Sequence, residues 1–187
     1  MHGAYAEYVR GNCDDDLIIL DDRNFFKSNT ALFVSQQISF EEYKKLIFER
    51  LTLINIEYTG YNIKEIDDSI ASLITSFIIK CITSTDSDDY IEKCFRAVSC
   101  MTHFQIYDDA NHRTGCRLLD MLLSYNGYDL DIKKVFEKNE ESLTYSIPII
   151  YDVDDPINID DRWYDFIKRP DTNQLPKENE QEDKPIL

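Results

Sequence analysis

The sequence predicts an all-α, mainly helical protein with a single domain over residues 1–169. Its 187 residues include 5 glycines and 5 prolines, too few for the many tight turns of an all-β protein. Several segments instead carry apolar residues at the three- and four-residue spacing of a helix that buries one face. The length allows one domain with a real core and little more. Residues 170–187 are almost all polar, and we expect a disordered acidic tail there.

The first predicted helix covers residues 39–51. Residues 1–30 are polar and predicted to be irregular, apart from an apolar run at 17–20. Ser39 with Glu42 three residues later forms a capping box, and apolar residues follow it at helical spacing. These features together predict that the helix begins at this serine.

The middle of the chain contains one ambiguous stretch and two clear helices. Over residues 52–63 apolar and β-branched residues alternate around Gly60, which fits a short β-hairpin, but the preceding helix could instead continue into a loop. Residues 64–82 are apolar around most of a helical circumference and predict a central, buried helix. A further helix is predicted over 88–106, where the apolar residues form one stripe.

The second half of the chain predicts three more helices. The letters "DDAN" interrupt the helical pattern, which restarts in "HRTGCRLLDMLLSY" and stops at the Asn-Gly pair 126–127. Another helix is predicted around 130–144. A last short helix over 161–169 would dock Trp163 and Phe166 onto the core.

Charge and cysteine content exclude several classes of function. The 36 acidic and 20 basic residues give a formal charge of −16, and no stripe of Lys and Arg offsets it. Such a chain repels nucleic acid and anionic membranes, so neither is an expected partner. Five cysteines without a C-x-x-C pair indicate neither a zinc site nor a disulfide framework. Because no segment reads as a signal peptide or a membrane span, we expect a cytoplasmic protein or an effector translocated into a host cytosol.

Residues 107–115, "YDDANHRTG", are the main candidate for a functional site. A helix that begins near Asn111 leaves backbone N–H groups free at its positive end, where a phosphate is stabilised. Arg113 can add a bidentate contact, and the Asn111 amide can hold the loop or bind a phosphate oxygen. Asp108 or Asp109 offers a hard oxygen to a Mg²⁺ ion that bridges phosphates. The alternative is an ordinary turn in which an Asp or Asn caps the helix.

Part of this loop resembles the signature of the Fic/Doc (Fido) family. That signature reads His-x-Phe-x-Asp/Glu-Gly/Ala-Asn-x-Arg, and the chain matches it with Asp109, Ala110, Asn111 and Arg113, while Tyr107 stands for the phenylalanine. The alanine, and the lack of a second arginine three residues after the first, are more similar to the Doc branch than to the Fic branch. The motif match covers about 9 residues, and with the flanking helices the likeness covers about 40.

The resemblance implies both a fold and a set of ligands. The fold would be a helical bundle with a β-hairpin flap, for which residues 54–63 are the candidate. Asp109 would hold Mg²⁺, and His112, at a variable position of the motif, could touch phosphate. Members transfer AMP or phosphate from a nucleotide to a hydroxyl of a target protein, so a toxin or effector with a target or regulatory protein as partner is implied. The implied ligands of the phosphates of ATP or another nucleotide are Ala110, Asn111, Arg113 and Thr114.

The chain departs from the family at the catalytic histidine, because Gln105 occupies that position. Histidine takes the proton from the target hydroxyl, whereas glutamine has no titratable group and can only hydrogen-bond. His103 lies two residues earlier, about 200° around a helix, and is one candidate for a replacement base. His112 and Asp108 are others.

Three interpretations of this departure stay open. The chain binds a nucleotide or phosphate ligand but is degenerate for the usual transfer, which makes it a pseudoenzyme. Alternatively, it is an active transferase that uses another base, or a competent enzyme in which the glutamine is an inactivating change. A different class of function is a non-catalytic acidic protein-interaction module, in which the loop only caps a helix.

Overall fold

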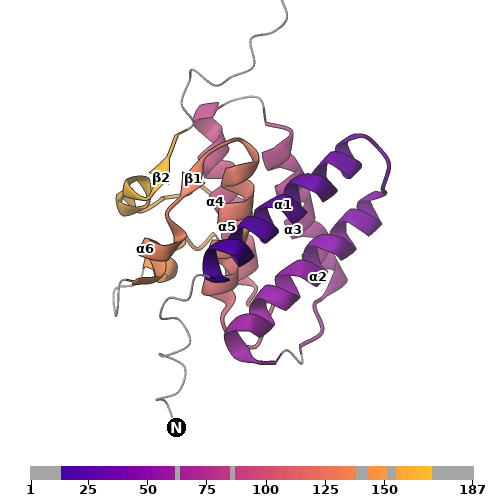
Figure 1. The fold of residues 1–187 in the computed structure, drawn as a ribbon, viewed down its shortest axis with the longest axis horizontal. Helices are drawn as coiled ribbons and strands as arrows, with labels where there is room; N and C mark the ends of the chain where they lie inside the picture. Colours follow the sequence, from indigo (N-terminus) through magenta and orange to yellow (C-terminus); the bar gives the residue numbers. More distant parts are fainter. Residues whose placement is uncertain (1–13, 62–63, 85–86, 138–142, 151–154, 170–187) are drawn as a thin grey trace, which may run out of the picture.

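The computed structural model of the protein is mainly helical, as predicted (Figure 1). It describes residues 14–61, 64–84, 87–137, 143–150 and 155–169, so the predicted tail at 170–187 lies outside the described residues. The elements in chain order are α1 (Asp14–Val34), α2 (Phe40–Thr59), α3 (Asp68–Ile82), α4 (Ser87–His103), α5 (Asn111–Tyr125), β1 (Asp129–Leu130), α6 (Ile132–Glu137), the 3₁₀ helices η1 (Leu143–Ser146) and η2 (Asp161–Asp165), and β2 (Ile167–Lys168). No helix within these ranges is long and apolar enough to cross a membrane.

Helix α1 contradicts the prediction that residues 1–30 are irregular, because its residues from 14 onward are helical. The residues that it buries lie four apart, at Asp22, Phe26 and Thr30. Two of these three are polar, so their spacing leaves no hydrophobic stripe in the sequence. Thr30 is hydrogen-bonded to the Tyr43 hydroxyl of α2 at 2.8 Å, which satisfies one of the buried polar groups.

Helix α2 begins as predicted and extends further than the hairpin interpretation allowed. The Ser39 hydroxyl accepts a hydrogen bond from the Glu42 N–H, and the Glu42 carboxylate accepts one from the Ser39 N–H, which confirms the capping box. The helix then continues to Thr59 and ends at Gly60, whose φ of 75° is the left-handed conformation of a C-cap. A β-hairpin flap at 54–63 is therefore wrong for the residues described there, and the continued helix is correct.

Loss of the capping box has a predictable effect on stability. In a Ser39→Ala variant the Glu42 N–H loses its acceptor, and we expect the free energy of unfolding to fall by about 1 kcal/mol. Ser76→Ala is the matched control, since Ser76 is exposed in the middle of α3 and its hydroxyl donates a hydrogen bond to the Ser72 carbonyl of the same helix. Urea denaturation of both variants checks this prediction, and equal midpoints for the two would contradict it.

The central helix of the bundle is α5, not the segment 64–82 that was predicted to be central. Helix α5 is buried on nearly all sides and contacts α1, α2, α3, α4, β1, α6 and η1. In Figure 1 it lies between α2 and α3 on one side and the small sheet with α6 on the other. Gly115 allows the close approach of α4, because a Cβ atom there would lie 3.0 Å from a methyl carbon of Val98.

Several predicted boundaries differ from the observed ones. Helix α3 begins at Asp68 with Asp67 as its N-cap, and α4 ends at His103, which is short of the predicted 106. The helix predicted around 130–144 is observed as the short α6, followed by η1 beyond residues that are not described. These differences place the loop between α4 and α5 at residues 104–110.

The C-terminal part closes one side of α5. The helix predicted over 161–169 is the short η2, after which β2 pairs antiparallel with β1. The Asp131 N–H donates to the Phe166 carbonyl at 2.9 Å, which adds a backbone hydrogen bond beside the pairing of the two strands. Trp163 and Phe166 are buried as predicted, and the Trp163 ring packs edge-on against Phe95 of α4.

Candidate functional site

The loop between α4 and α5 delivers the chain to α5 through an unusual first turn. Ala110 precedes the helix with φ 58°, a left-handed conformation that costs most residues about 1 kcal/mol or more. The Thr114 N–H bonds to the Ala110 carbonyl at 2.9 Å, which begins the helical ladder. Ala110 is the N-cap residue, and its methyl side chain makes no capping hydrogen bond. The first N–H groups of α5 therefore lack the usual N-cap side chain, and they lie at the positive end of the helix dipole.

Asn111 holds the loop in this conformation. Its side-chain oxygen accepts a hydrogen bond from the Tyr107 N–H at 2.9 Å, and its amide nitrogen donates to the Tyr107 carbonyl at 2.8 Å. The residue is buried, and so is the Tyr107 ring. Of the two roles that the sequence suggested for this amide, the structure shows the one of holding the loop.

Asn55 of α2 supports the loop from the other side, and sequence reasoning missed it. Its amide nitrogen donates to the Asp109 carbonyl at 2.8 Å and to the Thr114 hydroxyl at 3.1 Å. Asn55 is 1% exposed and Thr114 is fully buried, so Thr114 is a packing partner of the loop and not an exposed ligand. The available signal in the sequence was an amide side chain within an apolar stretch. The hairpin interpretation of that stretch did not place Asn55 in the core.

Asp108 and Asp109 are both exposed at the loop surface. One Asp109 carboxylate oxygen accepts a hydrogen bond from the Ala110 N–H at 2.5 Å, which orients the carboxylate beside the first turn of α5. Within the described ranges no cluster of three His, Cys, Asp or Glu side chains could hold a metal ion. A Mg²⁺ ion at Asp109 would therefore need phosphate oxygens and water as its other ligands, which is a usual arrangement for this ion.

Arg113 and His112 lie on the first turn of α5 and contact different elements. The Arg113 guanidinium lies over the Tyr58 ring of α2, 5.2 Å from its centroid. The His112 Nδ1 atom is 3.1 Å from the Thr144 carbonyl of η1. Because a carbonyl only accepts, Nδ1 carries the proton in that contact, and the lone pair of the neutral ring is on Nε2.

Gln105 and His103 are separated by the end of α4. His103 is the last helical residue, half-buried, with its ring edge-on to Phe104. Gln105 is exposed with φ 43°, and its backbone carbonyl accepts a hydrogen bond from the Lys64 ammonium. The contact with Lys64 uses the backbone, so it does not depend on the side chain at position 105.

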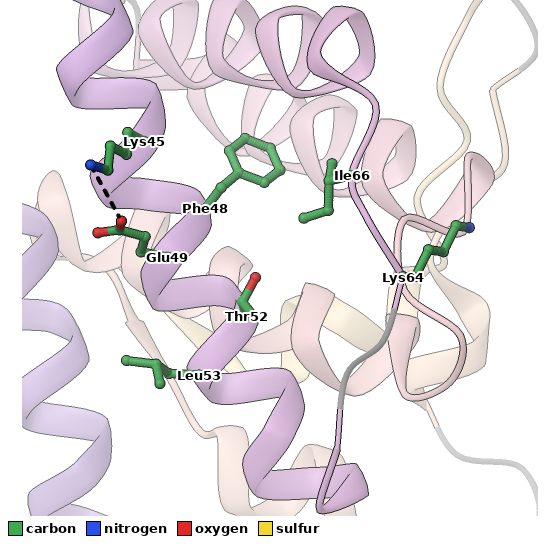
Figure 2. Close-up of a pocket in the computed structure, with 7 residues that line it drawn as sticks. All are labelled: Lys45, Phe48, Glu49, Thr52, Leu53, Lys64 and Ile66. Atoms are coloured by element: carbon green, nitrogen blue, oxygen red, sulfur yellow. Dashed lines mark ion pairs between the residues drawn. The ribbon is translucent and has the colours of Figure 1, made fainter.

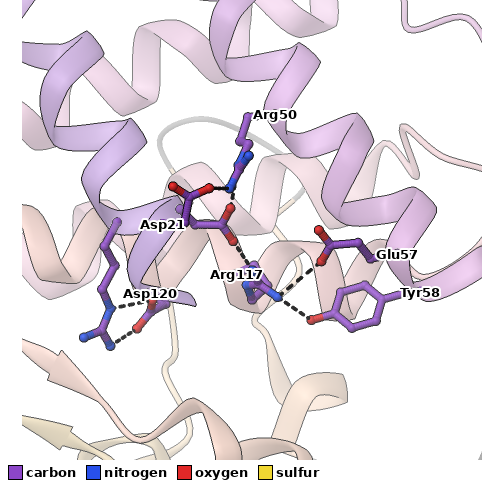
Figure 3. A network of polar contacts seen from close by, with 8 residues as sticks. Asp21, Arg50, Glu57, Tyr58, Arg117 and Asp120 are labelled. Atoms are coloured by element: carbon purple, nitrogen blue, oxygen red, sulfur yellow. Dashed lines mark hydrogen bonds and ion pairs between the residues drawn. The ribbon is translucent and has the colours of Figure 1, made fainter. Parts of the chain in front are cut away.

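One turn further along α5, Arg117 belongs to a buried ionic network (Figure 3). Its guanidinium pairs with the Asp22 carboxylate of α1, and it also lies 3.7 Å from Glu57 and 3.5 Å from the Tyr58 hydroxyl. Arg50 of α2 donates to the same Asp22 carboxylate at 2.5 Å. Arg117 is thus committed to holding α1 and α2 on α5. Burial raises the pKa of Tyr58 to about 12, so the phenol beside Arg113 stays neutral.

Cys116, which lies between Arg113 and Arg117 in the sequence, is an ordinary core residue. It is fully buried, and burial raises the pKa of its thiol well above the usual range. A thiol in this state is a poor nucleophile, so Cys116 adds no chemistry to the loop. The four cysteines in the described part of the chain are free.

An open groove lies beside the loop, between α2 and the segment that carries Lys64 and Ile66 (Figure 2). Phe48 of α2 and Ile66 face one another across it. It adjoins the loop through the Thr52 hydroxyl, 3.4 Å from the Tyr107 hydroxyl, and through Lys64. None of the residues that were predicted to form the site lines this groove. Its lining residues are Lys45, Phe48, Glu49, Thr52, Leu53, Lys64 and Ile66.

The loop therefore combines a set of hydrogen-bond donors, one arginine and an exposed carboxylate on a rigid support. Such a set can hold an anion and a shared divalent cation. At position 105 it offers a glutamine, which cannot take a proton. Comparisons of the chain with protein-family models, with curated proteins and with solved structures find no match.

Proposed function

We propose that residues 107–113 bind the phosphates of a nucleotide such as ATP, and that the chain is a Fic/Doc-like protein degenerate for histidine-dependent transfer. One observation carries the proposal: the N-cap residue of α5 is an alanine, Ala110, which has the left-handed conformation and no capping side chain. An ordinary helix start places Ser, Thr, Asp or Asn there. Here the two amides of Asn55 and Asn111 instead hold the loop, so that backbone donors are left for an anion.

The charged residues of the loop complete the proposed phosphate site. Arg113 is half-buried on the first turn of α5, and its guanidinium lies over the Tyr58 ring, which limits the rotamers it can adopt. Asp109 is exposed beside the same turn and would share a Mg²⁺ ion with the phosphates. Without a histidine at position 105, the bound nucleotide would serve recognition by a target or regulatory protein and not transfer to it.

A second candidate function is transfer that uses His112 as the base. The observation in its favour is the His112 contact with Thr144, which leaves a basic Nε2 on the first turn of α5. The two candidates predict different results for the wild-type chain, because a pseudoenzyme binds nucleotide without labelling any hydroxyl. Incubation with labelled ATP distinguishes them, and His112→Ala should abolish transfer if the second candidate is correct.

The phosphate site predicts a loss of affinity when Arg113 is replaced. We expect Arg113→Ala to raise the Kd for the nucleotide about tenfold or more, since a charge-assisted contact contributes roughly 1.5–3 kcal/mol. Titration calorimetry with ATP, CTP and UTP, with and without Mg²⁺, measures this effect. Asn111→Ala should weaken binding as well, through the loop that it holds.

Arg162→Ala is the matched control for this measurement. Arg162 is an exposed arginine on η2 that pairs with Asp160, and it lies outside the 107–113 loop. Its removal should leave the Kd unchanged. If wild type binds none of these nucleotides, or if Arg113→Ala binds as well as Arg162→Ala, the proposed function is wrong.

A further inference from the structure

We infer that Tyr145 forms a stacking surface for the base of the ligand, so that the site selects nucleotides over inorganic polyphosphate or a phosphorylated peptide. The inference rests on the proposed function, because it assigns the rest of a ligand whose phosphates lie at α5. It also assigns a role to a residue outside the 107–113 motif.

The exposure of Tyr145 is unusual for a ring on an anchored element. It is 73% exposed, the most exposed large hydrophobic side chain in the described residues. The 3₁₀ turn that carries it is nevertheless fixed in the core, since its neighbours Leu143, Thr144 and Ile147 are all buried. The Ser146 hydroxyl donates to the Leu143 carbonyl at 2.8 Å and closes the turn. An aromatic surface that is held rigidly in solvent loses little conformational freedom when a ligand stacks on it.

Two contacts place this ring beside the proposed phosphate site. The His112 ring centroid lies 5.0 Å from the Tyr145 ring centroid, with the planes tilted by 48°. His112 also bonds to the carbonyl of Thr144, the residue before Tyr145. His112 is the second residue of α5, so its backbone N–H belongs to the first turn that would hold the phosphates.

The chemistry of a nucleotide matches this juxtaposition. Base and phosphates are joined through one ribose, so a nucleotide site needs an aromatic or apolar surface adjacent to its anion-binding donors. A tyrosine face accepts any base by stacking. The face of Tyr145 away from His112 is where such a base would lie, and inorganic polyphosphate would gain nothing from it.

The test compares two ligands that share phosphates and differ in the base. Titrations of ATP and of tripolyphosphate, each with Mg²⁺, are made on wild type, Tyr145→Ala and Tyr145→Phe. We expect Tyr145→Ala to weaken the binding of ATP about tenfold and to leave the affinity for tripolyphosphate unchanged, while Tyr145→Phe keeps both affinities. Tyr164→Ala is the control, because Tyr164 is an exposed tyrosine on the other 3₁₀ helix, η2.

The outcomes separate this inference from the proposed function. If Tyr145→Ala binds ATP as wild type does, the stacking role is wrong. It is also wrong if the variant loses affinity for ATP and for tripolyphosphate equally. In both cases the proposed phosphate site stands. If wild type binds ATP but not tripolyphosphate, the base is required, and loss of ATP in Tyr145→Ala alone then assigns that requirement to Tyr145. If wild type binds neither ligand, the proposed function fails and this inference fails with it.

Discussion

A Gln105→His variant is expected to transfer labelled nucleotide or phosphate at least about 100-fold faster than the wild-type chain. A positioned general base contributes roughly 10²–10⁴-fold to proton transfer from a hydroxyl. Position 105 corresponds to the histidine of the Fic/Doc motif that the loop resembles, and the residues of the proposed phosphate site follow it. The substitution therefore supplies the one group that the proposed site lacks.

The local structure allows this substitution without rearrangement. Gln105 is exposed, so an imidazole meets no packed neighbour, and histidine is among the residues that adopt a φ near 43° more readily than most. The hydrogen bond from Lys64 goes to the backbone carbonyl of residue 105 and is kept. We consequently expect the variant to unfold at the same urea concentration as wild type.

The measurement follows a labelled nucleoside triphosphate with the chain itself and water as acceptors, because the target protein is not identified. Mass spectrometry detects modified hydroxyls, and chromatography detects hydrolysed nucleotide. Gln105→Ala should be as inactive as wild type. Combining Gln105→His with Arg113→Ala should remove the gained activity, and a double variant as active as the single one would show that the reaction does not use the proposed phosphate site.

The parts of the fold that follow from the sequence are those whose signals are local. The capping box at Ser39 and Glu42 is formed by residues three apart, so it could be recognised without knowledge of the fold. Helix α1 could not, because its inward stripe contains Asp22 and Thr30, whose burial depends on partners in α2 and α5. The same holds for the end of α2, where Asn55 is buried against a loop more than 50 residues away.

The candidate site shows the same division. Residues 107–113 are contiguous, so their motif could be read directly from the sequence. What the motif does not contain is the support from other elements: Asn55 and Tyr58 of α2, and Thr144 of η1. It also could not show that the Asn111 amide is used to hold the loop, since that depends on the turn adopted by the backbone between Tyr107 and Ala110.

Replacing Asp22 is expected to have the largest effect on stability. We expect Asp22→Asn to lower the free energy of unfolding by about 3 kcal/mol, because removal of one partner from a buried ion pair leaves the other charge uncompensated. The Asp22 carboxylate is 1% exposed and is shared by Arg50 and Arg117. Arg50 keeps a second partner in Asp21, but Arg117 is itself buried and would keep the Glu57 carboxylate at 3.7 Å and the neutral Tyr58 hydroxyl at 3.5 Å.

Asp21→Asn provides a closely matched control. Asp21 is the adjacent residue, carries the same charge and also pairs with Arg50, but its side chain is 71% exposed. An exposed pair contributes less than about 1 kcal/mol, so the same chemical change should cost little there. Urea denaturation of the two variants compares burial at constant chemistry. Equal losses would show that charge number, and not burial of the pair, determines the effect.

The Asp22 variant also tests how the loop is held. Arg117 lies one turn from Arg113 on α5, and both contact Tyr58, one through the hydroxyl and the other through the ring face. When Asp22 is lost, we expect Arg117 to shift toward Glu57 and to displace the Tyr58 side chain that it contacts. We therefore expect Asp22→Asn, under conditions where it is fully folded, to bind nucleotide more weakly than Asp21→Asn. Equal affinities would mean that the ionic network stabilises the bundle without positioning Arg113.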